Sequence, residues 1–197
     1  MVHPIETVPA LKRLDLLHVG CWEELSMEFQ SGLNIITKEG PALGRTTILQ
    51  AILHALAPSH ATRQWLSPTD GFPRGRISLE FLRPSHSVDL LPAFEAAAGP
   101  GPEESFGACT LDRLRDALAQ AGSDTCLLLE DDALSVLDER SYREAIGFLN
   151  AARCQVICLV RRRPDPADFP KARVFAVALG ESEKTVMKVL RSGGNAR

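Results

Sequence analysis

The sequence predicts an α/β fold with an N-terminal antiparallel β portion and a parallel core sheet. Short apolar runs of strand length suit buried strands, and they lie at residues 33–37, 126–129 and 155–160. Longer segments of helical periodicity separate these runs, at residues 45–57 and 141–152. Strands that alternate with helices in this way are typical of α/β proteins with a parallel sheet.

Each further element has its own local signal. Residues 11–19 read as a strand and residues 25–29 alternate as a second one, which gives the N-terminal β portion. Pro58 ends the first helix. Thr110 is placed to cap a helix with Leu111, Leu114 and Leu118 on one face, most simply a core face. The remaining strands are expected at residues 76–82, 174–179 and 185–190.

Composition is typical of one globular domain. The chain has 197 residues, of which 45% are hydrophobic and 24% charged, and a net charge of -3 that argues against a general affinity for nucleic acid. The five cysteines form no CxxC pair, which suits free thiols in a reducing compartment. No apolar run reaches the roughly 18 residues of a membrane span. We therefore expect a cytoplasmic protein without a membrane segment.

One stretch, TKEGPALGRTTIL at residues 37–49, lies between an expected strand and an expected helix. Gly44 and Thr46 match the end of the phosphate-binding motif G-x-x-x-x-G-K-[ST], with Arg45 in place of lysine. The position of the first glycine holds Glu39, and Gly40 matches only if the loop is one residue shorter. The alternative is an ordinary strand–turn–helix junction that contains a glycine.

A second motif, CLLLEDDALSVLD at residues 126–138, is an apolar strand that ends in carboxylates. Proteins with a phosphate-binding loop place a Mg²⁺ ligand at the end of such a strand. The carboxyl ends of parallel strands also meet at one edge of the sheet. The alternative is a buried strand with a solvated acidic end.

The run DDALSVLD at residues 131–138 resembles the Walker B motif and D-loop of RecF-type ABC ATPases. LKRLDLLHVGCWEEL at residues 11–25 and SGLNII at residues 31–36 resemble the opening of RecF and SMC heads. The resemblance extends over about residues 11–190. It implies the P-loop NTPase fold of an ABC ATPase head, with ATP and Mg²⁺ as ligands.

Roles follow from this resemblance residue by residue. Asp132 would polarise the attacking water, and Asp138 would be the D-loop residue that communicates across a dimer. Thr46 and Asp131 would bind Mg²⁺. The residues that would hold the nucleotide are Gly40, Gly44, Arg45, Thr46 and Thr47.

The sequence departs from the family pattern in several places. No glutamine occurs between Gln64 and Gln120, where the family has its Q-loop ligand, and SFGACT at residues 105–110 replaces the signature LSGG. Arg161 stands at the position of the switch histidine. Between residues 82 and 110 there is no room for a coiled coil. We expect one minimal head over residues 1–197, with a flexible loop at 92–107 and a disordered tail at 192–197.

Loss of several charged and positioning groups implies a weak ATPase or none. The predicted function is that of a RecF/SMC-like ATP-binding protein, a nucleotide-dependent or pseudo-ATPase subunit of a DNA repair or related DNA-maintenance complex. It would form a homodimer or pair with another ATPase-type subunit, and direct DNA contact has weak support because the net charge is negative. The alternative is a nucleotide-free scaffold or regulatory protein that binds a protein partner.

Overall fold

The computed structural model describes residues 5–40, 44–56, 75–82, 87–90, 110–130, 132–160, 164–180 and 185–191. The loop expected at residues 92–107 and the tail expected at residues 192–197 lie outside these ranges, so both stay predictions.

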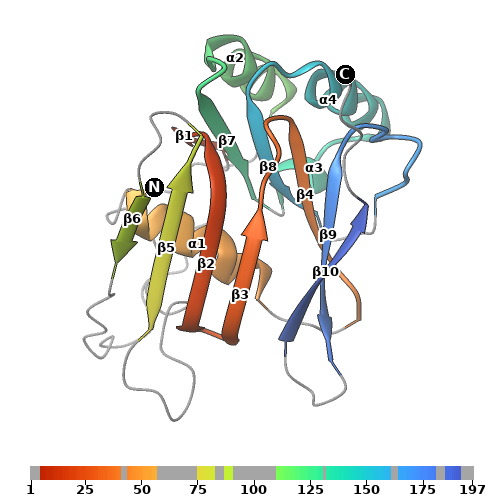
Figure 1. Ribbon diagram of the computed structural model, residues 1–197. Helices are drawn as coiled ribbons and strands as arrows, with labels where there is room; N and C mark the ends of the chain where they lie inside the picture. Colours follow the sequence, from red (N-terminus) through yellow and green to blue (C-terminus); the bar gives the residue numbers. More distant parts are fainter. Residues whose placement is uncertain are drawn as a thin grey trace, which may run out of the picture.

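The larger of two sheets has six strands in the order β1-β7-β8-β4-β9-β10 (Figure 1). Its four central strands, β7, β8, β4 and β9, are parallel, and β1 and β10 pair antiparallel at the two edges. The expected parallel core is therefore confirmed. The strands are β1 Ile5–Pro9, β4 Leu33–Lys38, β7 Thr125–Leu129, β8 Gln155–Leu159, β9 Arg173–Leu179 and β10 Thr185–Arg191.

The smaller sheet is antiparallel throughout, in the order β3-β2-β5-β6, and confirms the expected N-terminal antiparallel portion. Its strands are β2 Leu11–Val19, β3 Trp22–Glu28, β5 Arg76–Phe81 and β6 Ser87–Leu90. Inward residues of β2 and β3 alternate with exposed ones, as expected for a sheet with one solvated face.

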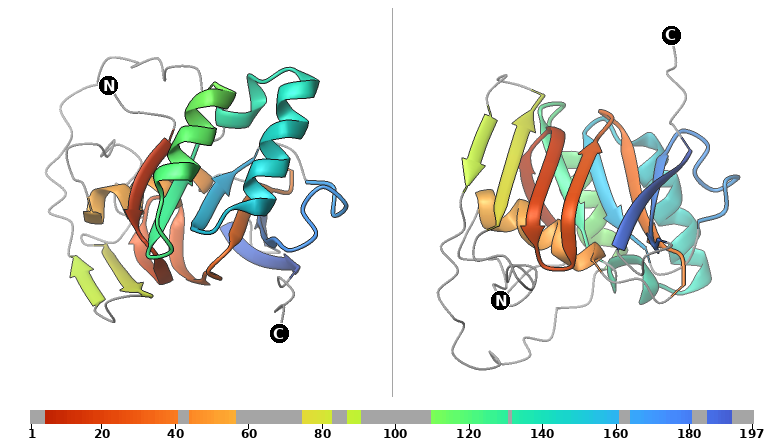
Figure 2. Two further views of the ribbon diagram at one scale, coloured as in Figure 1. Left: turned by 90° about the horizontal axis from the view of Figure 1, so that it is seen from above. Right: turned by 60° about the horizontal axis from the view of Figure 1, so that its bottom comes forward.

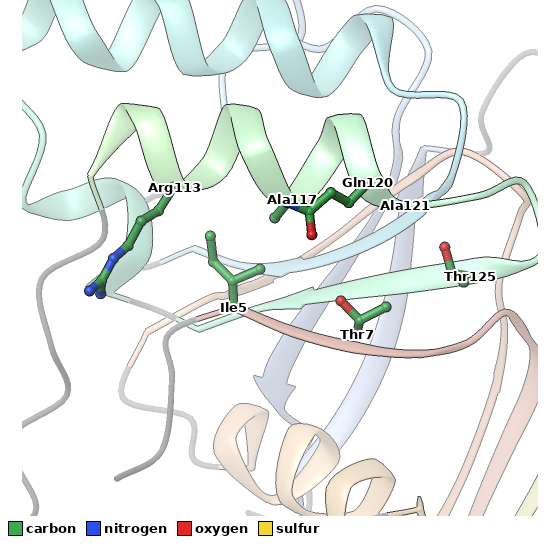
Figure 3. Close-up of a pocket in the computed structure, with 7 residues that line it drawn as sticks. All are labelled: Ile5, Thr7, Arg113, Ala117, Gln120, Ala121 and Thr125. Carbon is green, nitrogen blue, oxygen red and sulfur yellow. The ribbon is translucent and has the colours of Figure 1, made fainter.

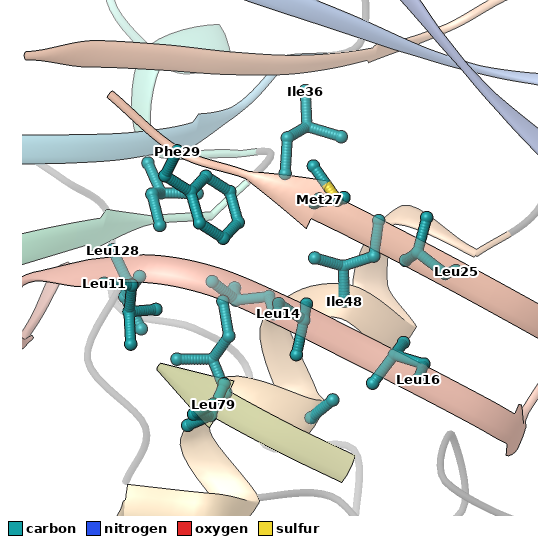
Figure 4. Close-up of a cluster of buried hydrophobic side chains, with 14 of the residues drawn as sticks. Leu11, Leu14, Leu16, Leu25, Met27, Phe29, Ile36, Ile48, Leu79 and Leu128 are labelled. Carbon is teal, nitrogen blue, oxygen red and sulfur yellow. The ribbon is translucent and has the colours of Figure 1, made fainter. Parts of the chain in front are cut away.

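The first helix, α1 (Arg45–Leu56), lies between the two sheets (Figure 2). Seven consecutive residues of α1, from Thr47 to Leu53, are buried, which requires neighbours on all sides of the helix. In one core cluster, Ile48 of α1 packs with Leu14 of β2 and Ile36 of β4 (Figure 4). The helix that follows the candidate loop is thus held by both sheets.

The opposite face of the larger sheet is covered by α2 (Leu111–Gln120), α3 (Asp132–Ser135) and α4 (Glu139–Ala151). Side chains alternate along β4, so Ile36 faces α1 while Ile35 faces the second cluster, which includes Leu114 of α2. Leu111 and Leu118 pack against the same cluster, which confirms that the leucine stripe of α2 is a core face. The Thr110 Oγ1 accepts from the Arg113 N–H at 3.3 Å and confirms the expected cap.

The sequence patterns did not predict β1, β6 or α3. Two of these are short strands at sheet edges, and the third is a single helical turn. β1 has five residues and ends in Pro9, a residue that is depleted in strands. Its strand conformation depends on pairing with β7, which is about 120 residues away. Nothing in the local pattern carries that information.

A buried amide joins the two sheets at the amino ends of the core strands. Gln155 of β8 is fully buried. Its Nε2 donates to the Leu11 and Gln30 carbonyl oxygens at 2.7 and 2.8 Å, and its Oε1 accepts from the Leu11 N–H at 2.8 Å. Asn34 adds to this contact, because its Nδ2 donates to the Gln30 carbonyl at 2.9 Å and its Oδ1 accepts from the Gln30 N–H at 2.9 Å. We call these hydrogen bonds of Gln155 and Asn34 the seam.

Replacing Gln155 with leucine removes the side-chain partner of the N–H and the C=O of Leu11. The C=O of Gln30 loses one of its two donors and keeps the Asn34 amide. We expect Gln155→Leu to lower the free energy of unfolding by about 3 to 5 kcal/mol, because each unsatisfied buried group costs about 1 to 3 kcal/mol. Urea denaturation measures the change. Gln120→Leu, on the exposed face of α2, is the matched control and should stay within about 0.5 kcal/mol of wild type. If the two substitutions lowered the free energy of unfolding equally, the hydrogen bonds of Gln155 would not contribute to stability as we expect.

Candidate functional site

The candidate loop connects the carboxyl end of β4, at Lys38, to the amino end of α1, at Arg45. β4 lies inside the parallel sheet, between β8 and β9. Ligands of open α/β sheets bind at this edge, where helix N-termini meet the carboxyl ends of strands. Residues 41–43 lie outside the described ranges, so the site is built from the residues on either side of them.

Gly44 occupies a position where no other residue fits. Its φ of +116° lies in the region that favours glycine. A Cβ added there would lie 2.7 Å from the Cys21 Sγ and 2.9 Å from the Nε1 and Cε2 atoms of Trp22. The Gly44 carbonyl accepts from the Ile48 N–H at 3.2 Å and from the Trp22 Nε1–H at 3.1 Å. The expected glycine at the end of the loop thus has a structural reason.

Two residues of the antiparallel sheet contact Gly44. Cys21 lies in the turn before β3, and Trp22 is the first residue of β3. Trp22 is fully buried, and its indole ring packs against Gly44. Desolvation raises the pKa of the Cys21 thiol, opposed in part by hydrogen bonds with Thr185 and Thr47, so the thiol is neutral at pH 7. The sequence did not predict the contact between Trp22 and Gly44, because no local pattern links two positions that are 22 residues apart.

Arg45 extends from the first turn of α1 to the end of the neighbouring strand β8. Its Nη1 donates to the Val160 carbonyl oxygen at 2.5 Å. The Val160 N–H bonds the Ile36 carbonyl at 3.0 Å, which keeps Val160 in line with β4. The side chain at the lysine position of the motif therefore spans the carboxyl edge of the sheet and binds backbone there.

Thr46 and Thr47 lie side by side in the first turn of α1 but differ in exposure. Thr46 is exposed, whereas Thr47 is buried and hydrogen-bonds the Cys21 thiol. Gly44 has no side chain to cap the helix, so the N–H groups of the first turn have no capping oxygen from that position. An exposed hydroxyl and a helix N-terminus that points outward fit a phosphate group.

Gly40 and Glu39 lie on the β4 side of the loop. Gly40 is exposed with a φ of +68°, and a Cβ added there would meet nothing within 4 Å. The Glu39 carboxylate, whose charge is unfavourable near a polyphosphate, lies 3.6 Å from the Lys188 Nζ of β10. The lysine therefore offsets part of that charge.

The acidic motif follows β7, which is not the direct neighbour of β4. β8 lies between them, so the two carboxyl ends are about 10 Å apart at the usual strand spacing. Asp131 lies outside the described residues, and Asp132 is the first residue of α3. The roles of both aspartates stay predictions. The end of β8, where Arg45 binds Val160, lies between the two motifs.

Asp138, the predicted D-loop residue, is the N-cap of α4. Its Oδ1 accepts from the Ser141 N–H at 2.8 Å. The hydrogen bonds with Ser141 lower the pKa of Asp138. The side chain is exposed, and its predicted role across a dimer stays a prediction.

Two further features concern the described residues as a whole. Among them, no group of three or more His, Cys, Asp or Glu is placed to hold a metal ion, and Asp131 lies outside this part of the chain. In the same part of the chain, no helix is both long and apolar enough to cross a membrane.

No family model matches the sequence, and no curated protein matches it. The structure, however, matches the SMC head domain from Thermotoga maritima over 92% of this chain and 99% of that one, with a TM-score of 0.55 and 12% identity. This chain has the fold of an SMC-type ATPase head. A second SMC head, solved bound to the C-winged helix domain of ScpA, matches over 93% of this chain and 98% of that one, with a TM-score of 0.51 and 12% identity.

The two matches confirm the predicted ABC ATPase-head fold. Both cover nearly the whole of the matched head. The expectation of one minimal head over residues 1–197 stays a prediction. At 12% identity they show the fold alone, so activity and partners of the head fold in this chain need their own argument.

Gly44→Ala should destabilise the protein by about 2 to 4 kcal/mol, because it adds backbone strain and forces the Cβ against Cys21 and Trp22. Gly40→Ala is the matched control, since it adds the strain of a positive φ without a clash and should cost about 1 to 2 kcal/mol. Thermal and urea unfolding of both variants measures the difference. A smaller loss for Gly44→Ala than for Gly40→Ala would contradict the close approach.

Asp138→Ala should lower the Tm at pH 7 by about 2–4 °C, because α4 loses its cap. The lowered pKa means that the ionised carboxylate stabilises the fold above the ordinary aspartate pKa. This stability is lost as the pH falls through the lowered pKa, so the two proteins should converge in acid. Asp138→Asn keeps a capping oxygen, so it should lie closer to wild type than Asp138→Ala at pH 7. Its difference from wild type should change with pH by the same amount as that of Asp138→Ala, because neither variant has the titrating carboxylate. Melting curves between pH 3 and pH 7 check both; a pH-independent gap for Asp138→Ala would argue against the carboxylate as the cause.

Proposed function

We propose that this chain is a nucleotide-binding subunit of the SMC-head type that binds ATP with Mg²⁺ and hydrolyses it weakly or not at all. It would act in a DNA repair or related DNA-maintenance complex, as a homodimer or paired with a more complete ATPase-type subunit. The observation that carries the proposal is the junction of β4 and α1. There a glycine that accepts no Cβ begins a helix whose first turn presents Arg45 and an exposed Thr46.

Phosphate oxygens fit this junction for two reasons. The first turn of α1 offers backbone N–H groups and the positive end of the helix dipole. Arg45 lies beside it with a guanidinium group that now binds the neutral Val160 carbonyl. An anionic phosphate is a stronger acceptor than a carbonyl, because hydrogen bonds between charged partners are about twice as strong. Thr46 would supply the hydroxyl for Mg²⁺, with Asp131 as its proposed partner ligand.

Weak hydrolysis is proposed because several groups that stabilise a transferring phosphoryl group are replaced. Arginine stands for the motif lysine, and a planar guanidinium does not reproduce a compact ammonium. The glutamine and signature positions lack the family residues, and Asp132 is one methylene shorter than the glutamate common at its position. Loss of one preorganised donor costs about 10²–10³ in rate.

A nucleotide-free scaffold is the second candidate, and the contact between Arg45 and Val160 favours it. A guanidinium that binds the backbone of a neighbouring strand can stabilise the head fold without any ligand. In that case the chain would act through a protein partner. One of the matched SMC heads was solved with such a partner, a winged helix domain of ScpA.

Thermal unfolding with and without ATP and Mg²⁺ decides between these functions. ATP at about 100 times its dissociation constant should stabilise a binding protein by about 2.7 kcal/mol, which is roughly 5–10 °C for a chain of this size. Arg45→Lys restores the motif lysine, so it should enlarge the ATP shift and lower the Tm without ligand as the Val160 bond is lost. Arg45→Met should abolish the shift.

Arg140→Met is the matched control, because Arg140 is an exposed residue of α4 that is remote from the loop in sequence and lies on the other face of the sheet. It should leave the ATP shift unchanged. Absence of a shift with ATP, ADP and GTP in both wild type and Arg45→Lys would reject nucleotide binding and leave the scaffold. Rapid phosphate release by the wild type would reject the weak hydrolysis.

A further inference from the structure

The edge strand β1 leaves one side of its backbone without a neighbouring strand. β1 pairs only with β7 within the described part of the chain. The Ala10 N–H donates to the Asp124 carbonyl at 3.0 Å, directly after the register pair of Pro9 and Thr125. Hydrogen-bonded pairs alternate along an antiparallel ladder. The N–H and C=O groups of Ile5 and Thr7 therefore point away from β7, toward the outside of the sheet.

A groove runs along this free edge, between β1 and α2. It has a volume of about 470 Å³ and is lined by Ile5, Thr7, Arg113, Ala117, Gln120, Ala121 and Thr125 (Figure 3). In that view Ile5 and Thr7 point toward α2, and Arg113 lies at the Ile5 end. The small side chains of Ala117 and Ala121 leave space on the helix side of the groove. A strand added beside β1 would place alternate side chains in this groove.

The groove carries one positive charge that α2 does not neutralise. Arg115 binds both acidic residues of α2, with 2.9 Å to the Asp112 Oδ1 and 3.8 Å to the Asp116 Oδ1. Arg113 is exposed, and within the described residues its guanidinium has no ion pair. A carboxylate is the complementary group for this end of the groove.

Pairing of β1 with the same strand of a second copy fits less well. A two-fold pairing centred on Thr7 would place Pro9 opposite Ile5 of the copy. Pro9 has no N–H, so the Ile5 carbonyl of each copy would find no donor on the other copy. A different strand with ordinary residues at these positions satisfies every outward group up to Pro9.

We propose that the free edge of β1 binds an extended, acidic segment of a partner protein, which adds as a strand beside Ile5 and Thr7 and places a carboxylate at Arg113. This interaction is independent of nucleotide binding, because β1 and β4 are separated by β7 and β8 in the sheet. The groove selects for an alternating sequence with small or apolar residues toward Ala117 and Ala121.

A displayed library of random ten-residue peptides, selected on the full chain, tests the proposal. The enriched peptides should carry acidic and β-branched residues, and fluorescence polarisation should give micromolar dissociation constants. Thr7→Pro removes the outward N–H but no bond to β7, as Pro9 does two residues later, so the strand can still form. It should weaken binding about tenfold. Thr7→Val keeps the N–H and is the matched control, expected to stay within about twofold.

Arg113→Glu tests the charge and should weaken acidic peptides about fivefold or more at low salt. Amide resonances of Ile5 and Thr7 in ¹⁵N–¹H spectra should shift on binding and report the location directly. No enriched peptide, equal binding to wild type and Thr7→Pro, or peptides without acidic residues would overturn the proposal. Sedimentation that shows a dimer dissolved by Thr7→Pro would also overturn it, because the edge would then bind a second copy.

Discussion

The contact between the two sheets depends on one buried side-chain amide. It forms hydrogen bonds with backbone groups that have no neighbouring strand at this point. Gln155 supplies two donors and one acceptor to backbone groups of Leu11 and Gln30, which lie where the antiparallel sheet meets the core. Because the side chains of Gln155 and Asn34 are fully buried, their polar atoms need hydrogen-bond partners within the protein. This fixes the start of β2 against the start of β8, and so fixes the gap between the sheets in which α1 lies. A helix buried on all sides can keep only one orientation there.

The position of α1 decides the chemistry of the opposite edge. Trp22 and Cys21 reach the amino end of the helix from the antiparallel sheet and leave no space beyond a glycine hydrogen at Gly44. The helix N-terminus is therefore held rigidly at the carboxyl edge of the core sheet, which is the arrangement that binds anions in open α/β folds.

Arg45, at the lysine position of the loop motif, contributes to the packing of the head fold. A lysine at this place presents a point charge on a flexible stem, whereas the guanidinium spans to the Val160 carbonyl and ties α1 to β8. This hydrogen bond joins residues that are 115 positions apart in the chain, so it depends on the completed fold.

The sequence by itself determined the fold class and most of the elements, because apolar periodicity reports which faces are buried. β2 and the start of α1 lie where the patterns predicted them, as do the cap at Thr110 and the glycine at Gly44. Only the tertiary structure decided the rest. β1 forms a strand because it pairs with β7. The Trp22 indole donates to the Gly44 carbonyl, and Arg45 donates to the Val160 carbonyl, which is 115 residues away in the chain. These contacts join segments remote in the chain, and local sequence carries no signal for a partner that folding alone brings near.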